Sequence, residues 1–135
     1  MYLIDTNVVS ELRRPRPHPL VVAWLRGVAD RNLFLSAVTL GELQAGVEIT
    51  RKQDNAKANE IEAWIDLVSG SWNILPVDGK VFRYWARLMH GRSNALIEDA
   101  MIAATAHIHG LIVVTRNVRD FKPLRVPTLD PFTPL

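Results

Sequence analysis

Met1-Tyr2-Leu3-Ile4-Asp5-Thr6-Asn7 opens the chain with a short apolar segment that ends in a carboxylate. The apolar residues predict a strand buried on both faces of a parallel sheet, and such sheets bind ligands beyond the carboxyl ends of their strands. A carboxylate buried at that point requires hydrogen bonds, an opposite charge or a metal ion. In the simplest alternative, Asp5 only precedes a helix that is capped by Thr6 or Asn7. The rest of the sequence bears on which role Asp5 has.

Short apolar segments and longer helical segments alternate along the chain. After the first strand, the sequence predicts strands at 32–36, 72–77, 111–115 and 125–127. This alternation predicts an α/β fold with a parallel sheet. Three predicted helices have defined ranges, namely 6–14, 79–89 and 96–110. A further helix starts in the proline-rich run 15–19, and a long helix begins at 38. Another helical segment runs through 61–68 and ends at a predicted break at 69–71.

The composition fits one domain, residues 1–135, with 48% hydrophobic residues. The chain has no cysteine, which excludes disulfides, thiolate zinc sites and cysteine nucleophiles and is compatible with a reducing compartment. We see neither a signal sequence nor an apolar run of membrane-spanning length and therefore expect a cytoplasmic protein. The net charge is only +2, and most of the basic residues are arginine. This permits nucleic-acid binding but fits an ordinary mixed-charge surface equally well.

Polar side chains recur where predicted strands end and predicted helices begin. Because the carboxyl ends of parallel strands meet at one edge of a sheet, we expect these side chains to lie there. Glu42 also has the spacing from Thr39 of a capping box, and Asp99 has the position of a simple partner of a helix dipole. These structural roles stay open beside a functional one. The residues expected at this edge are Asp5, Thr6, Asn7, Glu42, Asp99, Thr115, Asn117 and Asp120.

Carboxylates that converge from separate elements, without histidine or thiolate, form a hard oxygen site suited to Mg²⁺ or Mn²⁺. Such an ion activates a water for in-line attack on a phosphodiester and stabilises the charge on the leaving oxygen. The sequence contains no Ser-His-Asp order, phosphate-binding glycine loop or dinucleotide fingerprint. An aspartyl-phosphate phosphatase is disfavoured because Asn7 stands where its general acid would be. The residues favour metal-dependent hydrolysis.

Arginines near the same edge are candidates for RNA binding. Arg13 and Arg14 follow the first strand closely, and Arg116 and Arg119 follow the predicted strand at 111–115. The planar guanidinium group suits phosphate recognition. Simple solvation of these side chains is an equally good explanation from the sequence alone.

Four motifs in register resemble the PIN-domain family, most closely the VapC toxins of bacterial VapBC toxin–antitoxin pairs. They are LIDTN at the start, SAVTLGEL with Glu42, EDAMIAATA with Asp99, and VVTRNVRDF near the end. The resemblance covers nearly the whole chain. It implies a PIN fold, with a central parallel sheet in strand order 3-2-1-4-5 flanked by helices.

The resemblance also implies an Mg²⁺- or Mn²⁺-dependent endoribonuclease. The first, second and third acids of the family correspond to Asp5, Glu42 and Asp99, which are the implied metal ligands. At the fourth acidic position this sequence has Asn117 where many relatives have aspartate, and Asp120 is the nearest carboxylate.

Two further positions match residues that support these acids through hydrogen bonds in the family, namely Asn7 and Thr115. VapC-like proteins are typically homodimers, and the resemblance implies a cognate VapB-like antitoxin that silences the site and carries operator DNA binding. One alternative is a non-catalytic PIN subunit of an operator-binding regulator. Another is a nuclease that acts on DNA flaps or in rRNA processing.

Overall fold

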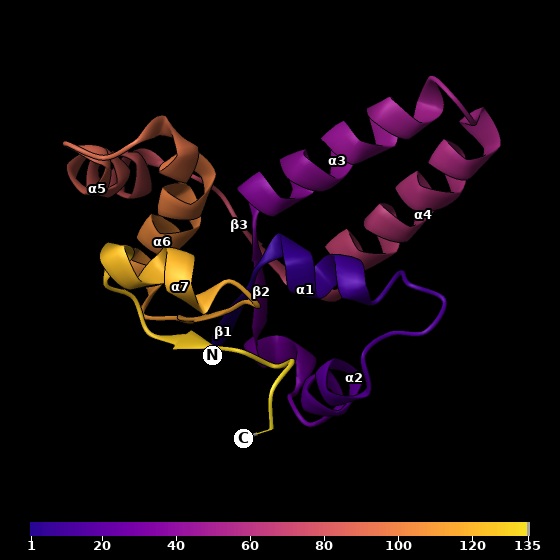
Figure 1. The fold of residues 1–135 in the computed structure, drawn as a ribbon, viewed down its shortest axis with the longest axis horizontal. Coiled ribbons are helices and arrows are strands. Elements are labelled where there is room, and N and C mark those ends of the chain that lie inside the picture. The colour runs from indigo at the N-terminus through magenta and orange to yellow at the C-terminus, as the bar shows by residue number, and fades with distance from the viewer. Residues whose placement is uncertain (135) are drawn as a thin grey trace.

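A five-stranded parallel sheet lies at the centre of the computed structural model, which describes residues 1–134 (Figure 1). The strand order is β3-β2-β1-β4-β5, which confirms the expected order 3-2-1-4-5. The strands are β1 (Tyr2–Ile4), β2 (Leu33–Ser36), β3 (Asn73–Leu75), β4 (Ile112–Val114) and β5 (Thr128–Leu129).

The central strand β1 is buried on both faces, as its apolar sequence predicts. Leu3 pairs in register with Phe34 of β2 and with Val113 of β4, and Leu3 and Ile4 expose no surface. Successive strand residues point to opposite faces, so Leu3 and Ile4 belong to two different hydrophobic clusters. Strand β1 therefore forms the middle of the sheet and contributes a side chain to each of the two hydrophobic clusters.

The helices cover the two faces of the sheet. Residues of α5 and α6 pack in the cluster that contains Leu3, whereas residues of α1, α2, α3 and α4 pack in the cluster that contains Ile4. Helices α3 and α4 form a long hairpin that extends away from the sheet (Figure 1). No helix within the described range is long and apolar enough to cross a membrane. The α-helices are α1 (Thr6–Glu11), α2 (Pro19–Arg26), α3 (Ala37–Arg51), α4 (Asn55–Ser71), α5 (Gly79–Met89), α6 (Ile97–His109) and α7 (Val118–Phe121).

Four predicted boundaries are wrong. Helix α1 ends at Glu11 rather than at 14, and strand β3 ends at Leu75 rather than at 77. The break predicted at 69–71 does not occur, because α4 continues to Ser71, whose hydroxyl donates to the carbonyl of Leu67. An exposed helical glycine such as Gly70 costs only about 1 kcal/mol, and the packing of the hairpin tolerates it. The last strand is Thr128–Leu129 rather than 125–127, because Arg125 adopts a left-handed conformation (φ 56°) that ends a 3₁₀ turn.

Helix α6 packs its alanines directly against the sheet. Ala100, Ala103, Ala104 and Ala106 expose no surface, and the small side chains let the helix approach closely. Gly110 caps the helix in a left-handed conformation (φ 65°), as the sequence predicts. The position of α6 matters because its first turn carries Asp99.

Substitution of Ala103 by leucine tests this close packing. Ala103→Leu should lower the free energy of unfolding by about 1–3 kcal/mol, because extra methyl groups at a buried interface force neighbouring atoms apart. Urea denaturation measures the change. Ala86→Leu on the exposed face of α5 is the control and should change the value by less than about 0.5 kcal/mol. An Ala103→Leu protein as stable as the parent would contradict a tight helix–sheet contact.

Candidate active site

Asp5 lies directly after β1 at the carboxyl edge of the sheet and is only 5% exposed. Its Oδ1 accepts from the backbone N–H of Thr6 at 2.8 Å, and its Oδ2 accepts from the Thr115 hydroxyl at 2.8 Å and from Asn7 Nδ2 at 3.2 Å. Asp5 is therefore itself the cap of α1, and the alternative in which Thr6 or Asn7 caps this helix is wrong. The three hydrogen bonds fix the carboxylate in one orientation.

Asn7 and Thr115 tie the start of the chain to the segment after β4. The Asn7 side chain donates to Thr115 Oγ1 at 3.3 Å, and its Oδ1 accepts from the backbone N–H of Arg116 at 3.1 Å. The N–H of Asn117 donates to Thr115 Oγ1 at 3.0 Å. The buried Thr115 hydroxyl thus donates one hydrogen bond, to Asp5, and accepts two, from Asn7 and Asn117. An asparagine suits position 7 because its amide both donates and accepts.

Glu42 lies on the second turn of α3 and faces α1. Its Oε1 accepts from the Thr6 hydroxyl at 2.8 Å, and Thr39 Oγ1 lies 3.2 Å from the same hydroxyl. The capping box of Thr39 and Glu42 does not form, because α3 begins three residues earlier than that pattern requires and Ser36 is its cap. Glu42 is left free to point toward the carboxyl edge of the sheet.

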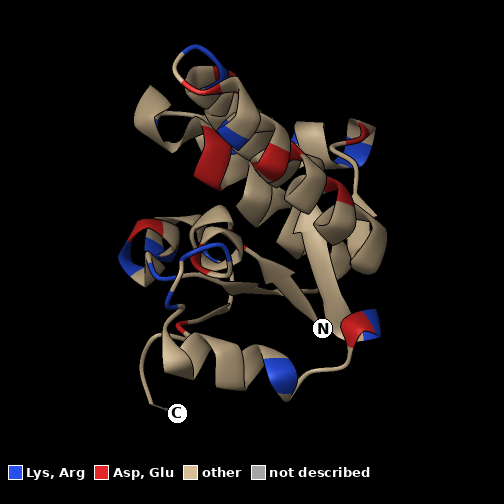
Figure 2. Ribbon diagram, turned by 90° about the vertical axis from the view of Figure 1, so that its right-hand side faces the viewer, with Lys and Arg blue, Asp and Glu red and all other residues tan. Residues whose placement is uncertain are grey.

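The pKa values of Asp5, Glu42 and Asp99 are all raised, and the charge of Asp5 contributes to the shifts of the other two. Burial raises the pKa of Asp5 and raises that of Asp99 to about 6, with further contributions to Asp99 from the charges of Asp5, Asp120 and Glu98. Burial also raises the pKa of Glu42 to about 7, and a hydrogen bond and the charge of Glu98 add to this shift. Asp5 follows β1, Glu42 lies on α3 and Asp99 lies on α6, and Figure 2 shows acidic positions on several separate helices. The structure thus brings the predicted acids together.

The donor chemistry of this cluster fits a hard divalent cation. Within residues 1–134, no three acidic, histidine or cysteine side chains stand close enough to enclose an ion by themselves. Mg²⁺ rarely needs such a cage, because it keeps several waters and binds one or two carboxylates together with substrate phosphates. A cation would also offset the charge repulsion from Asp5 and Glu98, which adds to the effect of burial in raising the pKa values of Glu42 and Asp99. Asp5, Glu42 and Asp99 could therefore share an ion with bound water.

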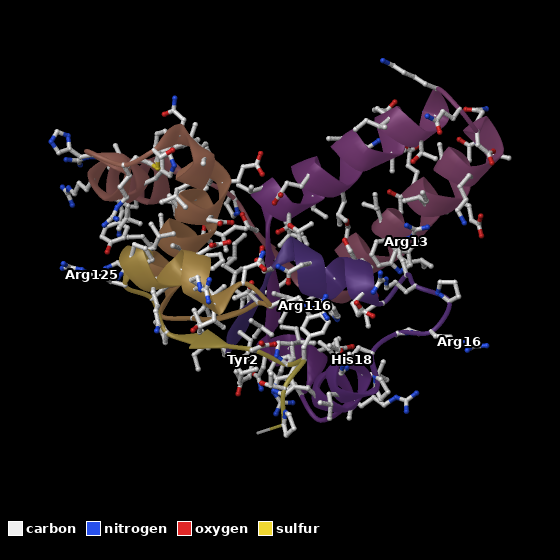
Figure 3. All side chains as sticks on the ribbon, viewed as in Figure 1. Tyr2, Arg13, Arg16, His18, Arg116 and Arg125 are labelled. Carbon is white, nitrogen blue, oxygen red and sulfur yellow. The ribbon has the colours of Figure 1, made fainter. Side chains whose placement is uncertain are left out.

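The predicted arginines lie around the cluster rather than in it. The Arg13 guanidinium carbon lies 5.6 Å from the centre of the Trp64 ring, Arg14 contacts Glu11 at 3.4 Å, and the Arg116 guanidinium carbon lies 3.8 Å from the centre of the Phe132 ring (Figure 3). These positions leave the acids without a basic neighbour from this set. The remaining predicted residues, Asn117, Arg119 and Asp120, are exposed and lie at or within the start of α7.

Sequence reasoning missed Glu98 and Glu11. Glu98 stands next to Asp99 in the first turn of α6, and its charge and hydrogen bond help to raise the pKa of Glu42. Its adjacency to a predicted site residue was an available signal. Glu11 is 5% exposed and accepts from the backbone N–H of His18 at 2.9 Å, so it holds the proline-rich loop against α1. No sequence pattern distinguishes Glu11 from a surface glutamate.

The raised pKa values predict how the metal-free protein responds to pH. Glu42 and Asp99 bind protons more tightly in the folded chain than in the unfolded chain, so the stability they contribute is complete below about pH 4 and is lost as the pH rises to about 7. Partial exposure limits the change to about 1–2 kcal/mol. Melting temperatures in EDTA should therefore be higher at pH 5 than at pH 8.

The variant Glu42→Gln should reduce this pH dependence, because it removes one of the carboxylates whose pKa is raised. Asp66→Asn, an exposed position on α4, is the matched control and should keep the dependence of the parent. A melting temperature that does not change between pH 5 and pH 8 would contradict the shared site.

Comparison with known proteins agrees with this architecture. The PIN domain family matches residues 2–125. Toxin FitB of Neisseria gonorrhoeae is 38% identical over 98% of this chain and 99% of FitB, and the VapC ribonuclease Y4jK of Sinorhizobium fredii is 32% identical over 99% of each. The solved structure of FitAB bound to an IR36 DNA fragment superimposes with a TM-score of 0.85 at 34% identity, over 100% of this chain and 98% of the other. The chain belongs to the PIN-domain family.

Proposed function

We propose that this protein is a divalent-metal-dependent endoribonuclease and the toxin component of a toxin–antitoxin pair. The observation that carries the proposal is the convergence of Asp5, Glu42 and Asp99 from three separate elements into one desolvated cluster with raised pKa values. The similarity to a protein named as a toxin and to another named as a ribonuclease supports the choice of substrate.

Each residue of the cluster has a role in this proposal. Asp5 is the fixed ligand, because three hydrogen bonds hold it, while Glu42 and Asp99 complete the oxygen set for Mg²⁺ or Mn²⁺. When bound, the ion supplies an activated water and stabilises charge on the phosphodiester. Thr6 orients Glu42 through its hydroxyl.

Asp120 is the better candidate for the fourth acid. Its charge contributes to the raised pKa values of both Asp5 and Asp99, so it lies close enough to act on both carboxylates. Asn117 instead donates its backbone N–H to the Thr115 hydroxyl. That hydroxyl in turn donates to the Asp5 carboxylate. In this assignment Asn117 is a positioning residue.

We further propose a cognate antitoxin, operator DNA bound through that antitoxin, and a homodimer. The structure of FitAB on DNA supports the first two. The α3–α4 hairpin carries apolar side chains that a partner would cover, since Ile49 is 68% exposed and Leu67 is 71% exposed.

The central prediction concerns RNA cleavage. Glu42→Gln and Asp99→Asn should each lower the Mg²⁺-dependent cleavage rate of single-stranded RNA by at least about 100-fold, a loss typical of removing one group that stabilises transition-state charge. The measurement is cleavage of end-labelled RNA with and without EDTA. Asp66→Asn is the control and should cleave like the parent.

Cleavage that persists in both site variants would refute the proposal. A protein that joins an operator-binding complex yet cleaves no RNA with any divalent metal would instead support the alternative of a non-catalytic PIN subunit. The feature that favours this alternative is Asn117, which stands where many relatives have aspartate.

A second prediction concerns the support of Asp5. Thr115→Val removes the hydroxyl that donates to Asp5 while keeping the size of the side chain, and it should raise the Mg²⁺ concentration needed for half-maximal cleavage by about 10-fold. Thr115→Ser keeps the hydroxyl and should restore most of this affinity. Equal metal requirements for the valine and serine variants would show that Thr115 acts only through packing.

A further inference from the structure

A groove between α1 and α3 runs away from the acidic cluster. Thr6 and Glu42, which belong to the cluster, line one end, and Arg13 and Thr50 line the other. The groove has a volume of about 270 Å³, just below the range of small-molecule sites. From position 42 to position 50, helix α3 rises about 12 Å, because each residue adds about 1.5 Å. The groove is therefore long enough for part of a nucleic-acid strand that leaves the cluster.

The walls of the groove combine apolar and hydroxyl groups. Leu43, Val47 and Ile61 supply the apolar surface, and Ser10 and Thr50 supply hydroxyl groups. A nucleobase has two flat apolar faces and a polar edge, so it can use both kinds of wall. Gly46 keeps the middle of the groove open, because no heavy atom lies within 4 Å of the place where a side chain at this position would begin.

Arg13 provides a positive charge at the far end. Its guanidinium group lies over the ring of Trp64, and within residues 1–134 it forms no ion pair. The neighbouring Arg14, by contrast, is paired with Glu11. Arg13 is thus placed by an aromatic ring while its charge stays available to a phosphate.

We infer that this groove, lined by Thr6, Gly46 and Arg13 among others, is a nucleotide subsite for single-stranded RNA. The inference rests on the proposed function: the scissile phosphate lies at the acidic cluster, the adjacent base lies against Leu43, Val47 and Ile61, and the next phosphate pairs with Arg13. The charge pattern favours RNA over a peptide, because a carboxylate cluster at one end and an unpaired cation at the other match two successive phosphates, the first held with a divalent cation.

The test fills the groove without removing any functional group. Gly46→Leu places a branched side chain in open space, and Gly70→Leu on α4 is the matched control, because this glycine is also helical and open but does not line the groove. Both are made in the Asp99→Asn background with Mg²⁺, so that the RNA stays intact. The ligand is a fluorescein-labelled single-stranded RNA of about eight nucleotides, followed by fluorescence anisotropy.

Gly46→Leu should weaken RNA binding by about 10-fold, whereas Gly46→Ala and Gly70→Leu should bind like the background protein. Arg13→Gln should lower the slope of log affinity against log salt by about 0.7, the value for one phosphate contact of a single strand. Arg16→Gln should leave the slope unchanged, because Arg16 lies on the loop after α1 and projects away from the body (Figure 3).

Unchanged RNA affinity in Gly46→Leu would overturn the inference. So would a Gly46→Leu protein that binds RNA normally but no longer binds its protein partner, because the groove would then be a protein-docking site. These results differ from a failure of the proposed function. A parent protein that binds RNA through the groove but never cleaves it would support the subsite and refute the nuclease.

Discussion

The burial of the Asp5 carboxylate is the constraint on which the site depends. Asp5 stands at the end of the central strand, where both cores exclude water, and its charge is compensated by hydrogen bonds from Thr6, Asn7 and Thr115. Those bonds in turn fix the start of α1 and the segment after β4. Burial raises the pKa of Asp5 although these hydrogen bonds oppose the shift, and burial also raises the pKa values of Glu42 and Asp99. The ionised cluster therefore lowers the stability of the metal-free chain.

Much of the fold and of the site could be predicted because the signals are local. Apolar runs that end in a polar residue mark the strands, and the carboxyl ends of parallel strands must share one edge, which places Asp5, Glu42 and Asp99 together. The resemblance to PIN domains supplied the strand order, which alternation alone does not determine. The role of Glu42 stayed ambiguous because it depends on where α3 begins, and a shift of three residues decides between a cap and a site residue.

Other features could not be predicted because they depend on tertiary contacts. Nothing in the sequence shows that Glu11 is buried against the loop at His18, or that Arg13 lies over Trp64, fifty-one residues further along the chain. The same limit applies to Glu98 on α6. It raises the pKa of Glu42 on α3 only because these two helices pack near each other. Local patterns identify which residues are polar at an edge, whereas the packing of helices decides which of them interact.

The pairing of β1 with β4 has a consequence for the order of synthesis. The Thr115 hydroxyl that holds Asp5 is added 110 residues after Asp5, and β4, which pairs with β1, directly precedes Thr115. Long-range pairings of this kind form late, because the intervening chain must be closed first. A chain still emerging from the ribosome therefore carries the acids without the geometry that joins them. The hydrogen bonds that hold Asp5 in place can form only after Thr115 has been added to the chain.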